Sequence, residues 1–140
     1  MSARTSPIVI GQRRERVIYE QLLRTEIVQY AGVSGDFSPL HTDEVYAVGA
    51  GYSGVMAHGM MIMAGSGCVL TDWVGVEALT RFRVRFRAPA WPGDRLTTTV
   101  IAEALREEGD SAHVDFSLST TNQNGVEVVA GTASARVGGR

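Results

Sequence analysis

Apolar and arginine residues alternate strictly along LTRFRVRFRAP, residues 79–89. Phe82, Val84 and Phe86 project to one side, and the other side carries Arg81, Arg83, Arg85 and Arg87. A period of two residues predicts a β-strand with one face on a core. The arginine face could bind phosphate groups, because guanidinium groups contact phosphates bidentately. The solvated outer face of a sheet is the simpler interpretation.

Further strand patterns follow, and turn residues separate them. They cover residues 95–107, 111–122 and 126–137. The turns are predicted at Pro92-Gly93, Gly109-Asp110 and Asn124-Gly125. Near the start of the chain, residues 14–23 alternate in part and predict the first strand.

Residues 58–73, HGMMIMAGSGCVLTDW, have a different pattern. They are apolar on almost every side and carry no charge before Asp72. A helix that is hydrophobic all round is a buried helix. Gly65 and Gly67 each weaken it by roughly 1 kcal/mol relative to Ala, which makes sense if another backbone comes close. We therefore expect a sheet that wraps this helix.

A short helix is predicted before this central helix. Thr25 is its expected N-cap, Glu26 lies in its first turn, and the helix runs through Tyr30 and Ala31. Residues 32–41, GVSGDFSPLH, are rich in glycine, serine and proline and predict a loop.

A second short helix is expected over residues 44–51, with Thr42 or Asp43 as its cap. Early helices followed by a run of antiparallel strands predict an α+β fold. A single curved sheet leaves strand edges open, so we also expect dimerisation.

Composition narrows the class of protein. A chain of 140 residues is long enough for one domain, residues 1–140, and too short for two. A formal net charge of −2 favours neither nucleic acid nor a membrane as a partner. Cys68 is the only cysteine, so no internal disulfide is possible and a cytoplasmic location is expected. We expect no signal peptide and no membrane span.

Asp36 and His41 lie five residues apart in the predicted loop, with Pro39 between them. An imidazole can accept and donate a proton near neutrality, and a neighbouring carboxylate could hold a water beside it. Pro39 would stiffen such a loop. The alternative is an ordinary turn, since Asp, Ser and Pro are common turn residues. Spacing alone leaves both interpretations open.

His58 and Gly59 stand where the apolar helix is predicted to begin. The first N–H groups of a helix have no partner within it, and Gly59 has no side chain to shield its own. The helix dipole would favour negative charge on a carbonyl oxygen bound there. Alternatively, His58 is an N-cap neighbour and Gly59 only permits the turn.

A metal site could use Asp36, His41, Asp43 or His58. No two histidines have the i, i+4 spacing of a zincin, and no second cysteine is present. We therefore expect no metal.

Two other groups of residues have simpler interpretations. His113 lies in a predicted strand beside Asp115 and is expected on the surface. Met60, Met61 and Met63 could line a flexible acyl tunnel, although methionine in a buried helix usually fills the core.

Together these segments resemble a known family. YAGVSGDFSPLHTD (residues 30–43) and GYSGVMAHGMM (51–61) are similar to the motifs of the MaoC-like (R)-specific enoyl-thioester hydratases and dehydratases, which have the hot-dog fold. RFRVRFRAPAWPGD (81–94) is similar to that family's strand and turn, and TDWVG (71–75) resembles the 3-hydroxyacyl-ACP dehydratase subunits of actinobacteria. The resemblance covers nearly the whole chain.

The resemblance implies roles for individual residues. Asp36 and His41 would activate water for addition to a trans-2-enoyl thioester, and the N–H of Gly59 would polarise the thioester carbonyl. The residues expected to contact the substrate are Ser38, His58, Met60 and Met63.

The resemblance also implies partners. The substrate would be an acyl-CoA or acyl-ACP thioester, no cofactor would be needed, and the chain would form a homodimer or a heterodimer with another hot-dog subunit.

One residue departs from the family pattern, which usually has asparagine where this chain has Ser38. The shorter side chain puts the rate or the substrate range in question more than the reaction. Two other functions remain open: a thioesterase on the same fold, and a non-catalytic subunit that shapes the acyl tunnel of a heterodimer.

Overall fold

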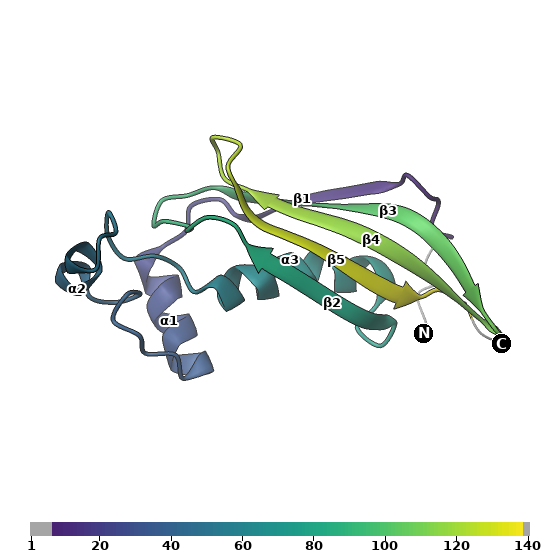
Figure 1. Cartoon of the computed structure of the whole chain (residues 1–140), viewed down its shortest axis with the longest axis horizontal. Helices are drawn as coiled ribbons and strands as arrows, with labels where there is room; N and C mark the ends of the chain where they lie inside the picture. Colours follow the sequence, from purple (N-terminus) through teal and green to yellow (C-terminus); the bar gives the residue numbers. More distant parts are fainter. Residues whose placement is uncertain (1–6, 139–140) are drawn as a thin grey trace.

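The computed structural model describes residues 7–138 as a five-stranded antiparallel sheet and three helices. The elements in chain order are β1 (Arg13–Tyr19), α1 (Arg24–Ser34), α2 (Glu44–Gly49), α3 (Gly59–Val74), β2 (Leu79–Phe86), β3 (Leu96–Glu108), β4 (Ser111–Thr121) and β5 (Glu127–Arg136). The strand order is β1-β3-β4-β5-β2, so β1 and β2 are the edges. The sheet curves along α3, while α1 and α2 lie beyond one end of it (Figure 1). The expected α+β architecture is confirmed.

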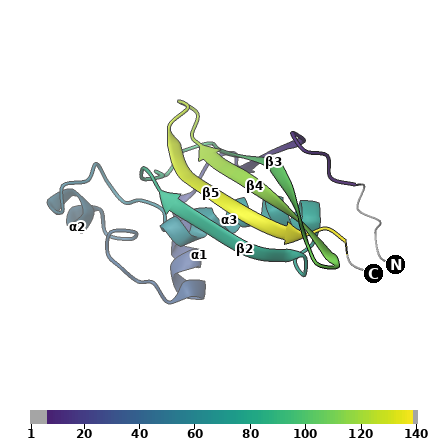
Figure 2. The same ribbon diagram turned by 45° about the vertical axis from the view of Figure 1, so that its right-hand side comes forward.

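The core lies between α3 and the concave face of the sheet (Figure 2). Ile62, Leu70 and Trp73 of α3 are buried, and the Trp73 ring meets the edge of Phe116 on β4 with centroids 5.3 Å apart. Burial of such side chains is worth roughly 1.5–3 kcal/mol each and is the main force that holds α3 on the sheet.

The opposite side of α3 is open, so the prediction of a helix buried all round is wrong. Met60 is 56% exposed, and Cys68 is exposed as well. A single sheet covers only one side of a helix, which leaves apolar residues of the other side exposed. Within residues 7–138, none of the helices is long and apolar enough to cross a membrane.

The two glycines in the middle of α3, Gly65 and Gly67, accommodate side chains of the sheet. A Cβ on Gly67 would lie 3.0 Å from the Phe82 ring, and one on Gly65 would lie 3.3 Å from Ile18. The sheet therefore comes close to α3 at both glycines, as expected. The close contacts are made by side chains of the sheet and not by its backbone.

Strand β2 has the predicted two faces. Phe82 and Val84 pack against the core, whereas all four arginines of the alternating stretch are exposed. Phe86, the last residue of the strand, is 52% exposed because it lies beyond the covered part of the sheet, beside the start of α3.

The ends of the early elements differ from prediction. The N-cap of α1 is Leu23 and not Thr25, and the Glu26 carboxylate accepts a hydrogen bond from the Leu23 N–H at 2.8 Å. The helix continues to Ser34, past the predicted end, because Gly35 adopts a left-handed φ of 76° and donates to the Ala31 carbonyl.

The cap of α2 is Asp43, one of the two predicted residues. Its side chain accepts from the Tyr46 N–H at 3.0 Å.

His113 is not the simple surface residue that we expected. Its side chain is only 15% exposed and lies 3.7 Å from Glu108.

Three buried hydroxyl groups join α3 to the sheet. Ser66 Oγ of α3 lies 2.7 Å from Thr120 Oγ1 of β4, which lies 2.7 Å from Thr98 Oγ1 of β3. Thr98 in turn donates to Ser66 at 3.2 Å. A closed ring of three hydroxyls satisfies each donor without water.

Candidate active site

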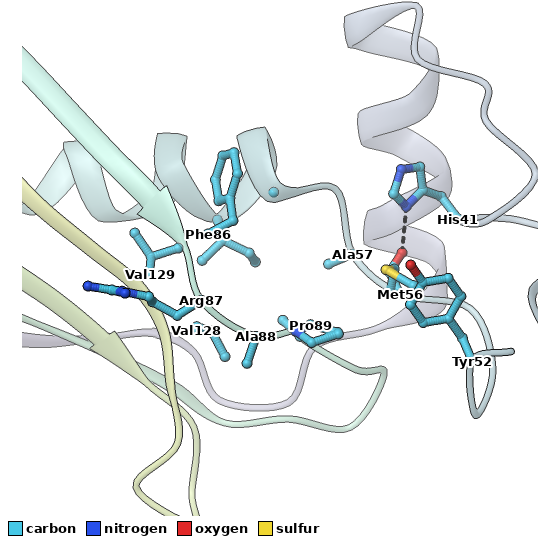
Figure 3. Close-up of a pocket in the computed structure, with 13 residues that line it drawn as sticks. His41, Tyr52, Met56, Ala57, Phe86, Arg87, Ala88, Pro89, Val128 and Val129 are labelled. Carbon is cyan, nitrogen blue, oxygen red and sulfur yellow. Dashed lines mark hydrogen bonds between the residues drawn. The ribbon is translucent and has the colours of Figure 1, made fainter.

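A pocket of about 300 Å³ opens between the start of α3, the end of β2 and the loop that follows α2. Its lining includes His41, Tyr52, Met56, Gly59, Ile62 and Phe86 (Figure 3). Aliphatic side chains of β5 and of the segment after β2 complete its walls. A mostly apolar pocket with few polar groups is typical of a site for a small apolar ligand.

The loop after α1 carries Asp36 to the side of His41. The left-handed Gly35 ends the helix immediately before Asp36, whose N–H donates to Ser34 Oγ at 3.2 Å. Asp36 Oδ1 then accepts from the Ser38 N–H at 3.2 Å. These local bonds form the turn predicted from the serine and aspartate residues. They also fix the Asp36 carboxylate, which faces the His41 imidazole.

Asp36 Oδ2 and His41 Nε2 are 3.8 Å apart, which is too long for a direct hydrogen bond. The His41 side chain is 12% exposed and that of Asp36 is 53% exposed. Two polar atoms at this separation, open to solvent on one side, can share a bridging water. The structure thus brings the predicted pair together.

The tautomer of His41 follows from its other nitrogen. Nδ1 lies 2.8 Å from the carbonyl oxygen of Met56, and a carbonyl can only accept (Figure 3). Nδ1 therefore carries the hydrogen, and Nε2 of the neutral ring presents its lone pair toward Asp36. A histidine oriented in this way is suited to act as a base.

His58 lies behind His41 and is only 1% exposed. Its ring stacks on the His41 ring with centroids 3.8 Å apart, and its Nε2 donates to the Asp36 carbonyl oxygen at 3.0 Å. Nδ1 has no hydrogen-bond partner among the described residues. His58 is not among the residues that line the pocket. The sequence pattern placed His58 at the start of the helix. Nothing in the motif indicated that His58 would contact both Asp36 and His41.

Gly59 is the first residue of α3 and lines the pocket, as predicted. Among the described residues its N–H makes no hydrogen bond. A Cβ at this position would lie 3.0 Å from the Phe86 ring, so only glycine leaves both the ring and the N–H undisturbed.

The other predicted contacts lie outside the pocket lining. Ser38 is half-buried in the loop, Met60 points to the open side of α3, and Met63 is half-buried. Their contact with a substrate stays a prediction. Met61 is 4% exposed and belongs to the core.

Sequence reasoning missed several residues of the pocket. Tyr52 and Met56 lie in the loop before His58, inside the quoted GYSGVMAHGMM segment, and Phe86 ends the alternating strand. Their position in that motif was a usable signal for the first two. Nothing in the alternation of Phe86 separates it from the core residues Phe82 and Val84.

Asp36, His41 and His58 form a group whose possible ligand atoms lie within 4.8 Å of one another. The His41 and His58 ring planes are inclined by only 26°, so their in-plane lone pairs run side by side. A zinc ion needs lone pairs that converge at about 2.0–2.1 Å. Moreover, the hydrogen on His58 Nε2 is already donated to Asp36. Asp43 is not in this group, because it caps α2. This geometry does not favour a zinc site, but it does not test metal binding, so the expectation of no metal stays a prediction.

Comparison with known proteins identifies the family. Residues 6–124 match the MaoC like domain. The 3-hydroxyacyl-[acyl-carrier-protein] dehydratase, mitochondrial, of Arabidopsis thaliana is 32% identical over 111 residues, which are 79% of this chain and 67% of that protein. The (R)-specific enoyl-CoA hydratase of Aeromonas caviae is 27% identical over 139 residues, 98% of this chain and 99% of that protein.

Solved structures agree in fold. An (R)-hydratase from A. caviae involved in PHA biosynthesis aligns with a TM-score of 0.82 at 23% identity, over 97% of this chain and 100% of that one. The ChsH1-ChsH2 complex from Mycobacterium tuberculosis aligns with a TM-score of 0.79 at 22% identity, over 93% and 98%. The chain belongs to the MaoC-like family and has the hot-dog fold of these hydratases.

Proposed function

We propose that this protein is a hydro-lyase that adds water reversibly to trans-2-enoyl thioesters and forms (3R)-hydroxyacyl thioesters. The observation that carries the proposal is the lone pair of His41 Nε2, which faces the Asp36 carboxylate across 3.8 Å beside the pocket. The names of the family members from A. thaliana and A. caviae support the same reaction class.

Hydration begins with a water held between Asp36 and His41. His41 Nε2 takes one proton from it, and the oxygen forms a bond to C3 of the enoyl group. The C2–C3 π electrons move toward the thioester, and the pair returns a proton to C2 from the same face. Because one pair handles both protons on one side, the addition is syn. Dehydration follows the same steps in reverse.

The N–H of Gly59 stabilises the charge that develops during this addition. Electron density from C3 reaches the thioester oxygen as enolate-like charge, and a free N–H at the start of a helix is suited to bind it. One such donor, removed from water, is worth roughly 3 kcal/mol in the transition state. These proposed steps require no redox group, and the expectation of no cofactor stays a prediction.

The apolar walls of the pocket suit an acyl chain. Ile62, Val128 and Val129 are buried side chains at its inner side, and Phe86 covers the start of α3. The carrier of the thioester would be CoA or acyl carrier protein, and both names occur among the relatives.

We also propose that a second hot-dog chain covers the open side of α3, in a homodimer or a heterodimer. The exposed Met60 and the open edge β2 support an additional subunit. The complex of ChsH1 and ChsH2 shows that this fold occurs in assemblies of two different chains.

A crotonyl-CoA assay tests the proposed reaction. The purified protein should remove the enoyl absorbance without release of free thiol, and chromatography should identify 3-hydroxybutyryl-CoA of R configuration. Release of thiol would identify a thioesterase instead. If the protein alone is inactive on all enoyl thioesters but activates a co-expressed hot-dog partner, it is a non-catalytic subunit.

A further inference from the structure

The three arginines of β2 and Arg87, which directly follows the strand, form a continuous row on the outer face of the sheet. Arg81, Arg83, Arg85 and Arg87 are all exposed and alternate with residues that face the core. At about 3.3 Å per residue, the row extends over roughly 20 Å. Figure 1 shows β2 along one edge of the sheet, with its end close to the start of α3.

Ion pairs neutralise only one end of this arginine row, although Arg81 lines a surface hollow together with Glu103 and Asp115. Within residues 7–138, Arg81, Arg83 and Arg85 form no ion pair, and Arg87 is 3.9 Å from Glu127. The neighbours of these three residues on β5 are Ser134, Thr132 and Ala130, all uncharged. The other arginines of the outer face differ, since Arg106 binds Asp115 with two hydrogen bonds. Three cations without an ion pair in one row make the surface attractive to an anionic partner.

The row ends at the pocket. Arg87 is its last member and one of the pocket-lining residues, and its side chain points away from His41 in Figure 3. A partner bound along the row is therefore placed beside the opening where His41 and Gly59 lie. Pairing of another strand with the β2 edge would leave the row exposed, because the arginines project from the face of the sheet and not from its edge.

We infer that the arginine row is a docking site for an acidic helix of an acyl carrier protein that delivers the thioester to the pocket. This inference rests on the proposed function. Successive arginines are about 6.6 Å apart, and carboxylates one turn apart on a helix are about 5.4 Å apart, a mismatch that long arginine side chains can span. The phosphates of one CoA nucleotide contact fewer positions than a row of this length offers.

The test compares two carriers of the same acyl group in steady-state kinetics. The variant is the triple substitution Arg81→Ser, Arg83→Ser and Arg85→Ser, which leaves the pocket-lining Arg87 in place. We expect the KM for crotonyl-acyl carrier protein to rise about tenfold or more, because three charge contacts are lost. The kcat for that substrate and both constants for crotonyl-CoA should stay unchanged.

A matched control lies on the opposite edge of the same sheet. Arg13 of β1 and Arg83 of β2 terminate one row of paired residues, Arg13–Ile101–Ser117–Thr132–Arg83. Arg13→Ser removes one positive charge from the far edge, where Arg13 is paired with Glu15, and should leave the KM for both substrates unchanged, whereas Arg83→Ser alone should raise the KM for the carrier protein. Equal effects of the two single substitutions would overturn the inference.

Direct binding separates this inference from the proposed reaction. Holo acyl carrier protein should bind the wild-type chain with an affinity that falls steeply with salt, and the triple variant should lose that salt dependence. If neither thioester is hydrated but this binding is seen, the proposed reaction fails and the docking site stands. The docking site is refuted if the triple variant binds the carrier protein as wild type does. It is also refuted if the variant loses activity on crotonyl-CoA but keeps its activity on crotonyl-acyl carrier protein.

Discussion

The imidazole rings of His41 and His58 stack with their centroids 3.8 Å apart and their planes inclined by 26°. The buried ring of His58 also donates from Nε2 to the carbonyl oxygen of Asp36. One side chain at the start of α3 therefore supports both members of the pair beside the pocket. The helix thereby places the loop relative to the N–H of Gly59.

The pair itself is tested by Asp36→Asn and His41→Ala. Each substitution should lower kcat for hydration of crotonyl-CoA by about 10²–10⁴-fold, because proton transfer from the attacking water and to C2 is lost. Circular dichroism and thermal unfolding should show an intact fold. Asp43→Asn is the control, since this carboxylate caps α2 and lies outside the pair. Nearly full activity of either pair variant would refute the assignment.

We expect His58 to act as a positioning residue, and two substitutions separate its contacts. His58→Phe keeps a ring under His41 but loses the bond to the Asp36 carbonyl, whereas His58→Ala loses both. We expect kcat to fall roughly tenfold to hundredfold in the phenylalanine variant, because small displacements of catalytic groups are costly. The kcat of the alanine variant should be lower still.

Comparison of kcat, KM and thermal stability in these two variants distinguishes a positioning role of His58 from simple destabilisation of the fold. The KM for crotonyl-CoA should change little in either, because His58 does not line the pocket. Thermal unfolding measured beside the kinetics shows whether the activity follows the folded fraction. If His58→Phe matches wild type in kcat, the bond to Asp36 has no role in catalysis.

The fold was largely predictable because the strands and the central helix have clear periods. Alternation in 79–89 gave the two faces of β2, and the apolar run gave α3 to within one residue at each end. The open side of α3 was missed because apolar residues on every side of the run suggested burial all round, whereas the single sheet expected from the same sequence covers only one side of the helix. The N-cap of α1 was missed because Leu23 has no capping side chain, while the carboxylate of Glu26 satisfies its N–H.

The site was predictable only in part. Asp36, His41 and Gly59 were found because their motif resembles that of a known family, whereas spacing alone left the turn interpretation open. The stacking of His58 on His41 and its bond to Asp36, 22 residues earlier in the chain, depend on how α3 meets the loop, which no local pattern encodes.

Gly59→Ala tests the helix terminus. A Cβ there would lie 3.0 Å from the Phe86 ring and beside the N–H that is proposed to bind the thioester oxygen. Phe86 is 52% exposed and can move, so the free energy of unfolding should change little. Alanine keeps the backbone N–H, so kcat should fall only as far as the Cβ keeps the thioester oxygen away from it. Complete loss of one such donor costs about 10²–10³-fold in kcat, and we expect a decrease of up to that size. Gly65→Ala in the same helix is the control and should keep kcat, because its Cβ meets Ile18 and not the pocket. Equal kcat for both variants would contradict the role of Gly59.

The acid stability of the fold should depend on Asp115. The side-chain bond from Arg106, followed by that from Ser134, lowers the pKa of Asp115 from 3.8 to about 2. A carboxyl with a lowered pKa stabilises the fold above its unfolded pKa, and this contribution is lost as pH falls from about 4 to 2. Asp115 is 32% exposed, so solvent screening reduces its contribution to about 1 kcal/mol.

Urea unfolding as a function of pH measures this contribution. Asp115→Asn should lower the free energy of unfolding at pH 7, and its difference from wild type should shrink below about pH 4. The control is Asp110→Asn in the β3–β4 turn, since Asp110 forms no ion pair among the residues described. A difference between Asp115→Asn and wild type that is constant down to pH 2 would contradict the linkage.

The buried hydroxyl ring of Ser66, Thr98 and Thr120 should respond to substitution in a non-additive way. Thr120→Val removes two bonds of 2.7 Å and leaves two hydroxyls in the core with only one bond between them. An unsatisfied buried hydroxyl costs about 1–3 kcal/mol, whereas apolar replacement of all partners of similar shape is nearly neutral. The triple variant Ser66→Ala, Thr98→Val and Thr120→Val should therefore lose less stability than the sum of the three single variants. Urea unfolding at pH 7 gives all four free energies, and additive losses would show that the three hydroxyls act independently.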